Sequence, residues 1–114
     1  MFMLVEALIR PQKLEAVRKA LADIGVKGLT ITEVRGSGRQ RGFTQQYRGV
    51  EYTVSLIQKI KIEAVVLENE ARVVARAIAE AARTGEIGDG KIFLIPVGDA
   101  VRIRTGEEGR DAVE

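Results

Sequence analysis

The chain has 114 residues and a formal net charge of +2, with 46% hydrophobic and 30% charged residues. These values fit one globular domain over 1–114 and exclude a largely disordered chain. Cysteine and histidine are both absent, which excludes disulfides, zinc-thiolate sites, cysteine nucleophiles and proton transfer by imidazole. No apolar run is long enough to span a bilayer and the start lacks the features of a signal peptide, so we expect a cytoplasmic protein.

The first half of the chain reads as strand, helix, strand. A short apolar run predicts a strand over 3–9, and Pro11 favours the start of a helix directly after it. Apolar residues at helical spacing predict that this helix continues to Gly25, which would end it. Alternating apolar and polar residues then predict a strand over 28–34.

The second half repeats this plan, with a strand expected over 60–67, a helix over 70–82 and a strand over 92–97. The segments 6–9 and 63–66 occupy matching places in the two halves, which indicates a duplicated βαβ unit. Such a duplication predicts an α+β, ferredoxin-like fold. Right-handed crossovers would place both helices on one face of a four-stranded antiparallel sheet.

The connection between the halves, 37–58, is too long for an ordinary turn, and loops of this length are usually functional or disordered. Val50, Tyr52, Val54 and Leu56 alternate with other residues as in a strand. We therefore expect a hairpin at the base of the segment; its tip is either one more part of that hairpin or a mobile element that binds a partner.

A glycine-rich segment, 85–91, fits the first seven positions of the phosphate-binding pattern G-x-x-x-x-G-K-[ST]. Ile92 stands where the magnesium-binding hydroxyl belongs, and a strand follows instead of a helix, so this is not a P-loop. Backbone amides could still converge on an anion beside Lys91. The alternative is a plain glycine-rich turn.

The segment 36–42 resembles a dinucleotide-binding fingerprint, but its third glycine is one place too late. It is either a flexible loop entry or a set of free amides beside Arg39 and Gln40.

Arg102 and Arg104 would share one side of an extended segment and could hold phosphate oxygens. Alternatively, they pair with the acidic residues that follow them. No candidate base, nucleophile or metal-ligand cluster accompanies these anion-friendly segments, so the sequence favours binding over catalysis and we expect no enzymatic activity.

Four segments resemble the signature segments of the PII family of nitrogen regulatory signalling proteins. They are 30–36 (TITEVRG), 47–52 (YRGVEY), 82–93 (ARTGEIGDGKIF) and 101–107 (VRIRTGE). The resemblance implies a homotrimer of ferredoxin-like subunits that senses nitrogen, carbon and energy status. It also implies a mobile effector loop over 37–58, a nucleotide-phosphate loop over 83–91 and a C-terminal loop over 102–114.

The resemblance further implies that ATP or ADP binds between subunits. The implied nucleotide contacts are Thr30, Gly36, Gly38, Arg39, Gln40, Glu63, Val65, Gly88, Asp89, Gly90, Lys91, Arg102, Ile103 and Arg104. Gln40 would also help to hold a Mg²⁺ ion that bridges ATP and 2-oxoglutarate, and Lys59 would pair with a carboxylate of the keto acid. Tyr52 matches a tyrosine that a separate transferase nucleotidylates in this family, or it is one more residue of a hairpin.

Partners implied by the resemblance are an ammonium transporter, acetylglutamate kinase, a glutamine synthetase-modifying enzyme or a transcription regulator. We expect no nucleic acid, and a membrane only through a transporter partner. One alternative is a diverged PII paralogue that senses nucleotide with another small metabolite. An RNA-binding ferredoxin-like domain is a weaker alternative, because aromatic residues are only 4% of the chain and offer little platform for base stacking. A small hydrolase on the same fold would need a catalytic base, and none is evident.

Overall fold

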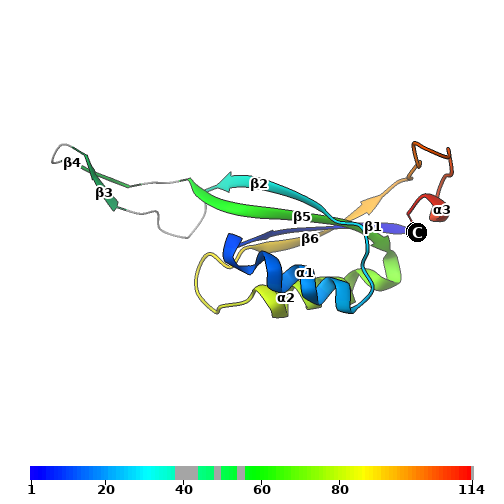
Figure 1. Ribbon diagram of the computed structural model, residues 1–114, viewed down its shortest axis with the longest axis horizontal. Coiled ribbons are helices and arrows are strands. Elements are labelled where there is room, and N and C mark those ends of the chain that lie inside the picture. The colour runs from blue at the N-terminus through cyan, green and yellow to red at the C-terminus, as the bar shows by residue number, and fades with distance from the viewer. Residues whose placement is uncertain (38–43, 48–49, 54–55, 114) are drawn as a thin grey trace.

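The structure is a computed structural model that describes residues 1–37, 44–47, 50–53 and 56–113 (Figure 1). At 44–47 and 50–53 it describes the backbone alone. The strands in this part of the chain are β1 (Phe2–Ile9), β2 (Thr30–Gly36), β3 (Thr44–Tyr47), β4 (Val50–Thr53), β5 (Ile57–Leu67) and β6 (Lys91–Val97). The helices are α1 (Leu14–Asp23), α2 (Ala71–Ala82) and the short α3 (Arg110–Val113), with 3₁₀ turns η1 (Pro11–Lys13) and η2 (Glu68–Glu70) ahead of α1 and α2.

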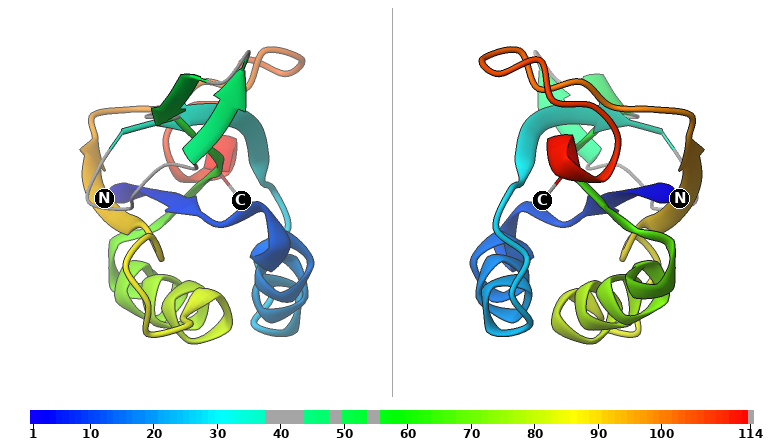
Figure 2. Two further views of the ribbon diagram at one scale, coloured as in Figure 1. Left: turned by 90° about the vertical axis from the view of Figure 1, so that its left-hand side faces the viewer. Right: turned by 90° about the vertical axis from the view of Figure 1, so that its right-hand side faces the viewer.

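The main sheet has four antiparallel strands in the order β2-β5-β1-β6. Both long helices cover one face of this sheet (Figures 1 and 2). The two central strands come from the two halves of the chain, and Glu6 lies directly opposite Glu63 in their register. The predicted duplication and the α+β fold with a four-stranded antiparallel sheet are therefore confirmed.

The core lies between the helices and the sheet. Side chains alternate across a strand and recur every three to four residues on a helix, so one face of each element is buried. The fully buried side chains at this interface include Val5, Ile9, Ile62, Val17, Leu21 and Ile78. Each contributes about 1.5–3 kcal/mol by leaving water.

The long connection contains two paired regions. β5 begins at Ile57, three residues earlier than predicted, and its first residues pair with the end of β2 at Gly36. Beyond this base, β3 and β4 form an antiparallel hairpin between 44 and 53. The hairpin prediction is confirmed for these residues, and the predicted mobility and partner binding of 37–58 stay predictions.

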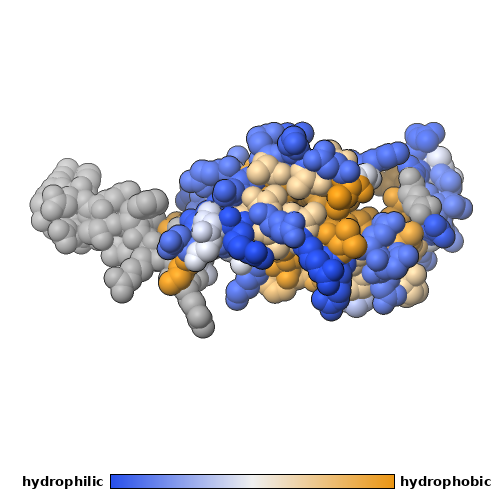
Figure 3. All heavy atoms as spheres, turned by 90° about the horizontal axis from the view of Figure 1, so that it is seen from below, coloured by the Kyte–Doolittle hydropathy of each residue, from blue (hydrophilic) through white to orange (hydrophobic). Residues whose placement is uncertain are grey.

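Apolar side chains are exposed on both faces of the molecule. Seen from the helix side, hydrophilic side chains surround a broad apolar area over the middle of the surface (Figure 3). On the opposite face of the sheet, which we call the open face, Val65, Phe93 and Ile95 are 40%, 43% and 39% exposed. The register places Leu4 between Val65 and Ile95. The open face therefore presents a row of apolar side chains that most solvated sheet faces lack.

None of the helices in the described part of the chain has the length and hydropathy of a membrane span.

Candidate functional site

The loop 83–90, which we call the phosphate loop, joins the end of α2 to β6. Gly85, Gly88 and Gly90 have φ angles of +89°, +105° and +101°, a region that glycine enters without strain. At Gly90 a side chain is also excluded by space, because a Cβ would lie 1.7 Å from the carbonyl oxygen of Leu8. The loop thus depends on glycine both for its path and for its close approach to β1.

Asp89 ties the two ends of the phosphate loop together. Its Oδ2 accepts hydrogen bonds from the amides of Thr84 and Gly85, both at 2.9 Å, and the Thr84 hydroxyl donates to Oδ1 at 2.5 Å. The Thr84 hydroxyl and then these amides hold the pKa of Asp89 well below its usual range, against a smaller opposing effect of burial. The carboxylate is therefore satisfied by its own loop.

Two cations from the sheet hold the other side of the phosphate loop. Arg10, at the end of β1, places Nε 3.2 Å from Asp89 Oδ1, and its Nη2 donates to the carbonyl of Ile87 at 2.9 Å. Lys59 in β5 donates to the carbonyl of Gly88. Partial burial lowers the pKa of Lys59, the charge of Arg10 adds to this, and Asp89 opposes it. Strands from both halves of the chain thus converge on one loop.

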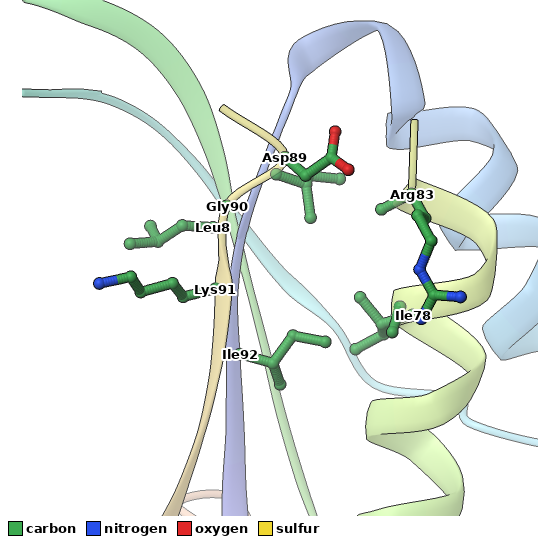
Figure 4. Close-up of a pocket in the computed structure, with 10 residues that line it drawn as sticks. Leu8, Ile78, Arg83, Asp89, Gly90, Lys91 and Ile92 are labelled. Carbon is green, nitrogen blue, oxygen red and sulfur yellow. The ribbon is translucent and has the colours of Figure 1, made fainter. Parts of the chain in front are cut away.

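A hollow of about 230 Å³ lies behind the phosphate loop, between α2 and β6. In Figure 4 the side chains of Ile78, Arg83 and Ile92 line it, and Asp89 lies at its upper end. Lys91 points to the other side of β6 (Figure 4). Because Lys91 and Phe93 share a face by strand alternation, the Lys91 ammonium belongs to the open face of the sheet.

The open face also carries the other predicted sheet residues. Thr30 lies opposite Glu63 in the register of β2 and β5, and Val65 follows Glu63 on the same face because side chains alternate. Lys59 shares this face but lies four residues before Glu63, or about 13 Å along the strand. The predicted residues Thr30, Glu63 and Val65 therefore come together, apart from Lys59 and the phosphate loop.

The C-terminal segment folds differently from the prediction. We expected Arg102 and Arg104 on one side of an extended stretch, and this is wrong because the chain turns there. The Gly106 amide donates to the Arg102 carbonyl at 2.8 Å, and Gly106 has a φ of +73°. Arg102 instead places Nε 3.5 Å from Glu107 Oε1 and donates to the carbonyl of Asp111 at 3.1 Å. The alternative, pairing with an acidic residue that follows, is confirmed for Arg102.

Comparison with known proteins settles the family. The sequence profile described as "Nitrogen regulatory protein P-II" matches residues 2–107. The chain belongs to the P-II family. It is 58% identical over 109 residues to the P-II protein of Microchaete diplosiphon and 57% identical over 109 residues to that of Synechocystis sp.. Each match covers 96% of this chain and 97% of the relative.

The fold agrees with this assignment. A crystal structure described as Arabidopsis thaliana PII bound to citrate superposes with a TM-score of 0.80 at 41% identity, covering 99% of this chain and 90% of that one. P-II proteins are regulatory signalling proteins that bind small effectors and act on target proteins, and they are not enzymes. The predictions of the family and of no enzymatic activity are confirmed.

Several predicted site residues of this P-II chain lie beyond what the structure describes. Gly38, Arg39 and Gln40, the last of which is the predicted Mg²⁺ ligand, lie outside the described residues. Tyr52 lies in β4, where only the backbone is described. Ile103 is described and is 99% exposed, at the tip of the C-terminal turn; Arg104 beside it is also exposed.

Sequence reasoning missed two residues that hold the phosphate loop in shape, Arg10 and Thr84. It treated Arg10 only as the end of a strand and gave Thr84 no role. Arg10 contacts Asp89 across 79 positions of the chain, and no local pattern reveals such a contact. Pairing β1 with β6 in the correct register, with Leu8 opposite Lys91, would have placed Arg10 next to the loop.

The ionisation of Asp89 gives a direct test of this loop geometry. An ordinary aspartate titrates near pH 3.9, and the Asp89 carboxyl should titrate clearly below that value. Because its folded pKa is lowered, ionised Asp89 stabilises the folded state above about pH 4, and this contribution disappears as the pH falls through the lowered pKa. The carboxyl carbon shift, followed by NMR from pH 7 downwards, measures the midpoint.

Thr84→Val is the matched control for this titration. It removes the hydroxyl that lowers the pKa most and keeps the backbone donors. The midpoint should therefore move up towards the ordinary value. Equal midpoints in the two proteins would contradict the arrangement around Asp89.

Proposed function

We propose that this P-II protein reports nitrogen, carbon and energy status by binding ATP or ADP together with 2-oxoglutarate between the subunits of a homotrimer. It regulates partner proteins through the loop 37–58. The observation that carries the proposal is the phosphate loop, which is shaped by three left-handed glycines and held from outside by Arg10 and Lys59.

The phosphate loop is suited to anions. Successive backbone amides in a turn of left-handed glycines can converge on an anion. The Asp89 carboxylate would repel phosphate if it were unpaired, but Arg10 compensates its charge and the amides of Thr84 and Gly85 donate hydrogen bonds to it. Lys91 adds a positive charge at the end of the loop. The segment 88–91 would thus hold nucleotide phosphates.

The keto acid would bind beside the same loop. Lys59 is a partly buried ammonium with a lowered pKa at the Gly88 carbonyl, and a carboxylate partner would compensate its lost hydration. Within the described residues there is no group of three or more acidic, histidine or cysteine side chains that could hold a metal. That fits a Mg²⁺ ion whose oxygen ligands come mainly from ATP and 2-oxoglutarate, with the Gln40 amide oxygen as the protein ligand.

The separation of the predicted residues supports a site shared between subunits. Thr30 and Glu63 lie about 13 Å from Lys59 along β5. One subunit would supply the phosphate loop and Lys59, and its neighbour would supply Thr30, Glu63 and Val65 to the adenosine, with Arg102, Ile103 and Arg104 of the C-terminal loop nearby. The apolar open face of the sheet supplies the surface on which the subunits would associate.

The effector loop is linked to the ligand site through the sheet. Lys59 lies opposite Val34 in the ladder of β2 and β5, and this ladder is the base from which 37–58 extends. A ligand that binds Lys59 would therefore act on the root of the loop. ATP with 2-oxoglutarate and ADP alone would favour different loop conformations. An ammonium transporter, acetylglutamate kinase, a glutamine synthetase-modifying enzyme or a transcription regulator would read the difference. Nucleotidylation of Tyr52 by a separate transferase would add a further input.

Calorimetric titration of 2-oxoglutarate tests the proposal. The titration is repeated with magnesium-ATP, with ADP and with neither. Binding should appear only with magnesium-ATP, because the keto acid would need the Mg²⁺ ion that ATP brings, with Gln40 as its protein ligand. Lys59→Ala and Gln40→Ala should each weaken it by at least about tenfold, since each removes a charged or metal-ligand contact.

Lys19→Ala is the control, because Lys19 is an exposed lysine of α1, on the opposite side of the molecule, and pairs with Asp23 at 3.8 Å. It should leave the affinity for 2-oxoglutarate unchanged. If ATP binds and 2-oxoglutarate never does, the protein senses nucleotide with another metabolite. If neither nucleotide binds, the assignment of the phosphate loop fails.

A further inference from the structure

Arg10 is the described side chain that links β1 to the phosphate loop. Its guanidinium reaches two different groups of the loop at once, the Asp89 carboxylate at 3.2 Å and the Ile87 carbonyl at 2.9 Å. The side chains of Arg10 and Asp89 are only 19% and 25% exposed. An ion pair so shielded is held more firmly than one on the open surface, where such pairs contribute little.

Arg10 attaches the phosphate loop to the sheet at a second point, beside the contact of Lys59 with the Gly88 carbonyl. The donors from Thr84 and Gly85 close the loop upon itself but do not attach it to the sheet. Arg10 fixes that closed loop to the end of β1, and it holds the Ile87 carbonyl next to the residue whose carbonyl Lys59 holds. Two successive carbonyls are thus turned towards cations of the sheet.

We propose that Arg10 is a positioning residue of the phosphate site: it sets the conformation of 84–89 through Asp89 and Ile87, and does not act by contacting the nucleotide. This inference rests on the proposed function for its effect on affinity. The conformational part of it stands on the loop geometry alone.

The contact requires arginine in particular. A planar guanidinium can direct Nε to a carboxylate and Nη2 to a carbonyl at the same time. A lysine at this position keeps the charge but has one ammonium, so it cannot reproduce both contacts with the same geometry. Arg10→Lys therefore separates the charge near the site from the two-point attachment of the loop.

The test combines NMR hydrogen exchange with calorimetry on the full chain. The amides of Thr84 and Gly85 report the closed loop, because both donate to Asp89. In Arg10→Met their protection should fall by about tenfold, and the affinity for magnesium-ATP should fall by a similar factor, as expected for losing one charged contact. In Arg10→Lys the loss of protection should persist, with a smaller loss of affinity.

Arg18→Met is the matched control, because Arg18 pairs at 3.1 Å with Glu15 on the exposed surface of α1. It should change neither quantity. Urea unfolding of all variants separates a local change in the loop from a global loss of stability.

Three outcomes would overturn the positioning role. Unchanged amide protection with weaker nucleotide binding would mean that Arg10 contacts the ligand directly. Unchanged protection and unchanged affinity would mean that the contact is incidental. A loss of protection matched by an equal loss throughout the protein would make Arg10 a general structural residue. If the wild type fails to bind nucleotide, the proposed function fails, while the protection data still decide whether Arg10 sets the loop.

Discussion

Gly90→Ala should abolish nucleotide binding and lower the free energy of unfolding by about 3 kcal/mol or more. The added Cβ would lie 1.7 Å from the carbonyl oxygen of Leu8, and φ at this position is +101°. Leu8 belongs to the central strand β1 and pairs with Lys91 of β6. To remove the clash between the new Cβ and the Leu8 carbonyl, β6 would have to move away from β1 where their pairing begins. Urea unfolding monitored by circular dichroism measures the loss of stability, and calorimetry with magnesium-ATP measures binding.

Gly85→Ala is the matched control for this substitution. Gly85 has a similar φ of +89°, but a Cβ there would meet nothing within 4 Å. Alanine should cost only about 1–2 kcal/mol at this position, from the left-handed backbone. The difference between the two variants isolates the contact with Leu8. If the two variants lose equal free energy of unfolding, the loop can shift at Gly90 to accommodate a side chain. The close approach to Leu8 would then not fix the position of the loop.

The elements of the fold were predictable because their signals are local and repeat. The matching segments 6–9 and 63–66 revealed the duplication, and the structure places Glu6 opposite Glu63 on neighbouring strands. Helical spacing of apolar residues located both long helices to within a few residues. The glycines of 85–91 predicted a loop there because backbone positions with a positive φ are usually occupied by glycine.

The contacts within the site were much less predictable. Arg10 contacts Asp89 only because β1 and β6 lie side by side in the sheet. The sequence near either residue therefore gives no indication of the contact. Arg102 and Arg104 were placed on one face by strand alternation, and the turn that Gly106 closes breaks that alternation. Alternation of side chains between two faces applies only where the chain is extended. Gly106, four residues after Arg102, was the sequence signal for a turn in place of a strand.

The apolar side chains of the open face are exposed to water in the single chain. Its row of Val65, Phe93 and Ile95 lies on the face of the sheet that the long helices do not cover. The ion pair of Lys61 and Glu6, at 3.9 Å, lies beside this row with side chains only 30% and 23% exposed. Apolar side chains next to a shielded ion pair resemble a surface that another subunit covers, which is the arrangement proposed for the homotrimer.

Ile95→Lys should therefore convert the proposed homotrimer into monomers. Ile95 is 39% exposed in the single chain, so the monomer can accommodate lysine with its ammonium in water. In the trimer three such ammonium groups would be buried against apolar side chains, at a cost of several kcal/mol each when unpaired. Size-exclusion chromatography with light scattering should give three chain masses for the wild type and one for the variant, with an unchanged circular dichroism spectrum.

Val73→Lys is the control on the opposite side of the molecule, because Val73 in α2 is 55% exposed on the helix layer. It should remain trimeric. Nucleotide binding should be lost together with the trimer in Ile95→Lys, since Thr30 and Glu63 would no longer face the phosphate loop of a neighbour. A variant that stays trimeric would place the subunit contact elsewhere than on the open face. A monomer that still binds magnesium-ATP at full affinity would mean that one chain holds the whole site, although Lys59 and Glu63 lie about 13 Å apart along β5.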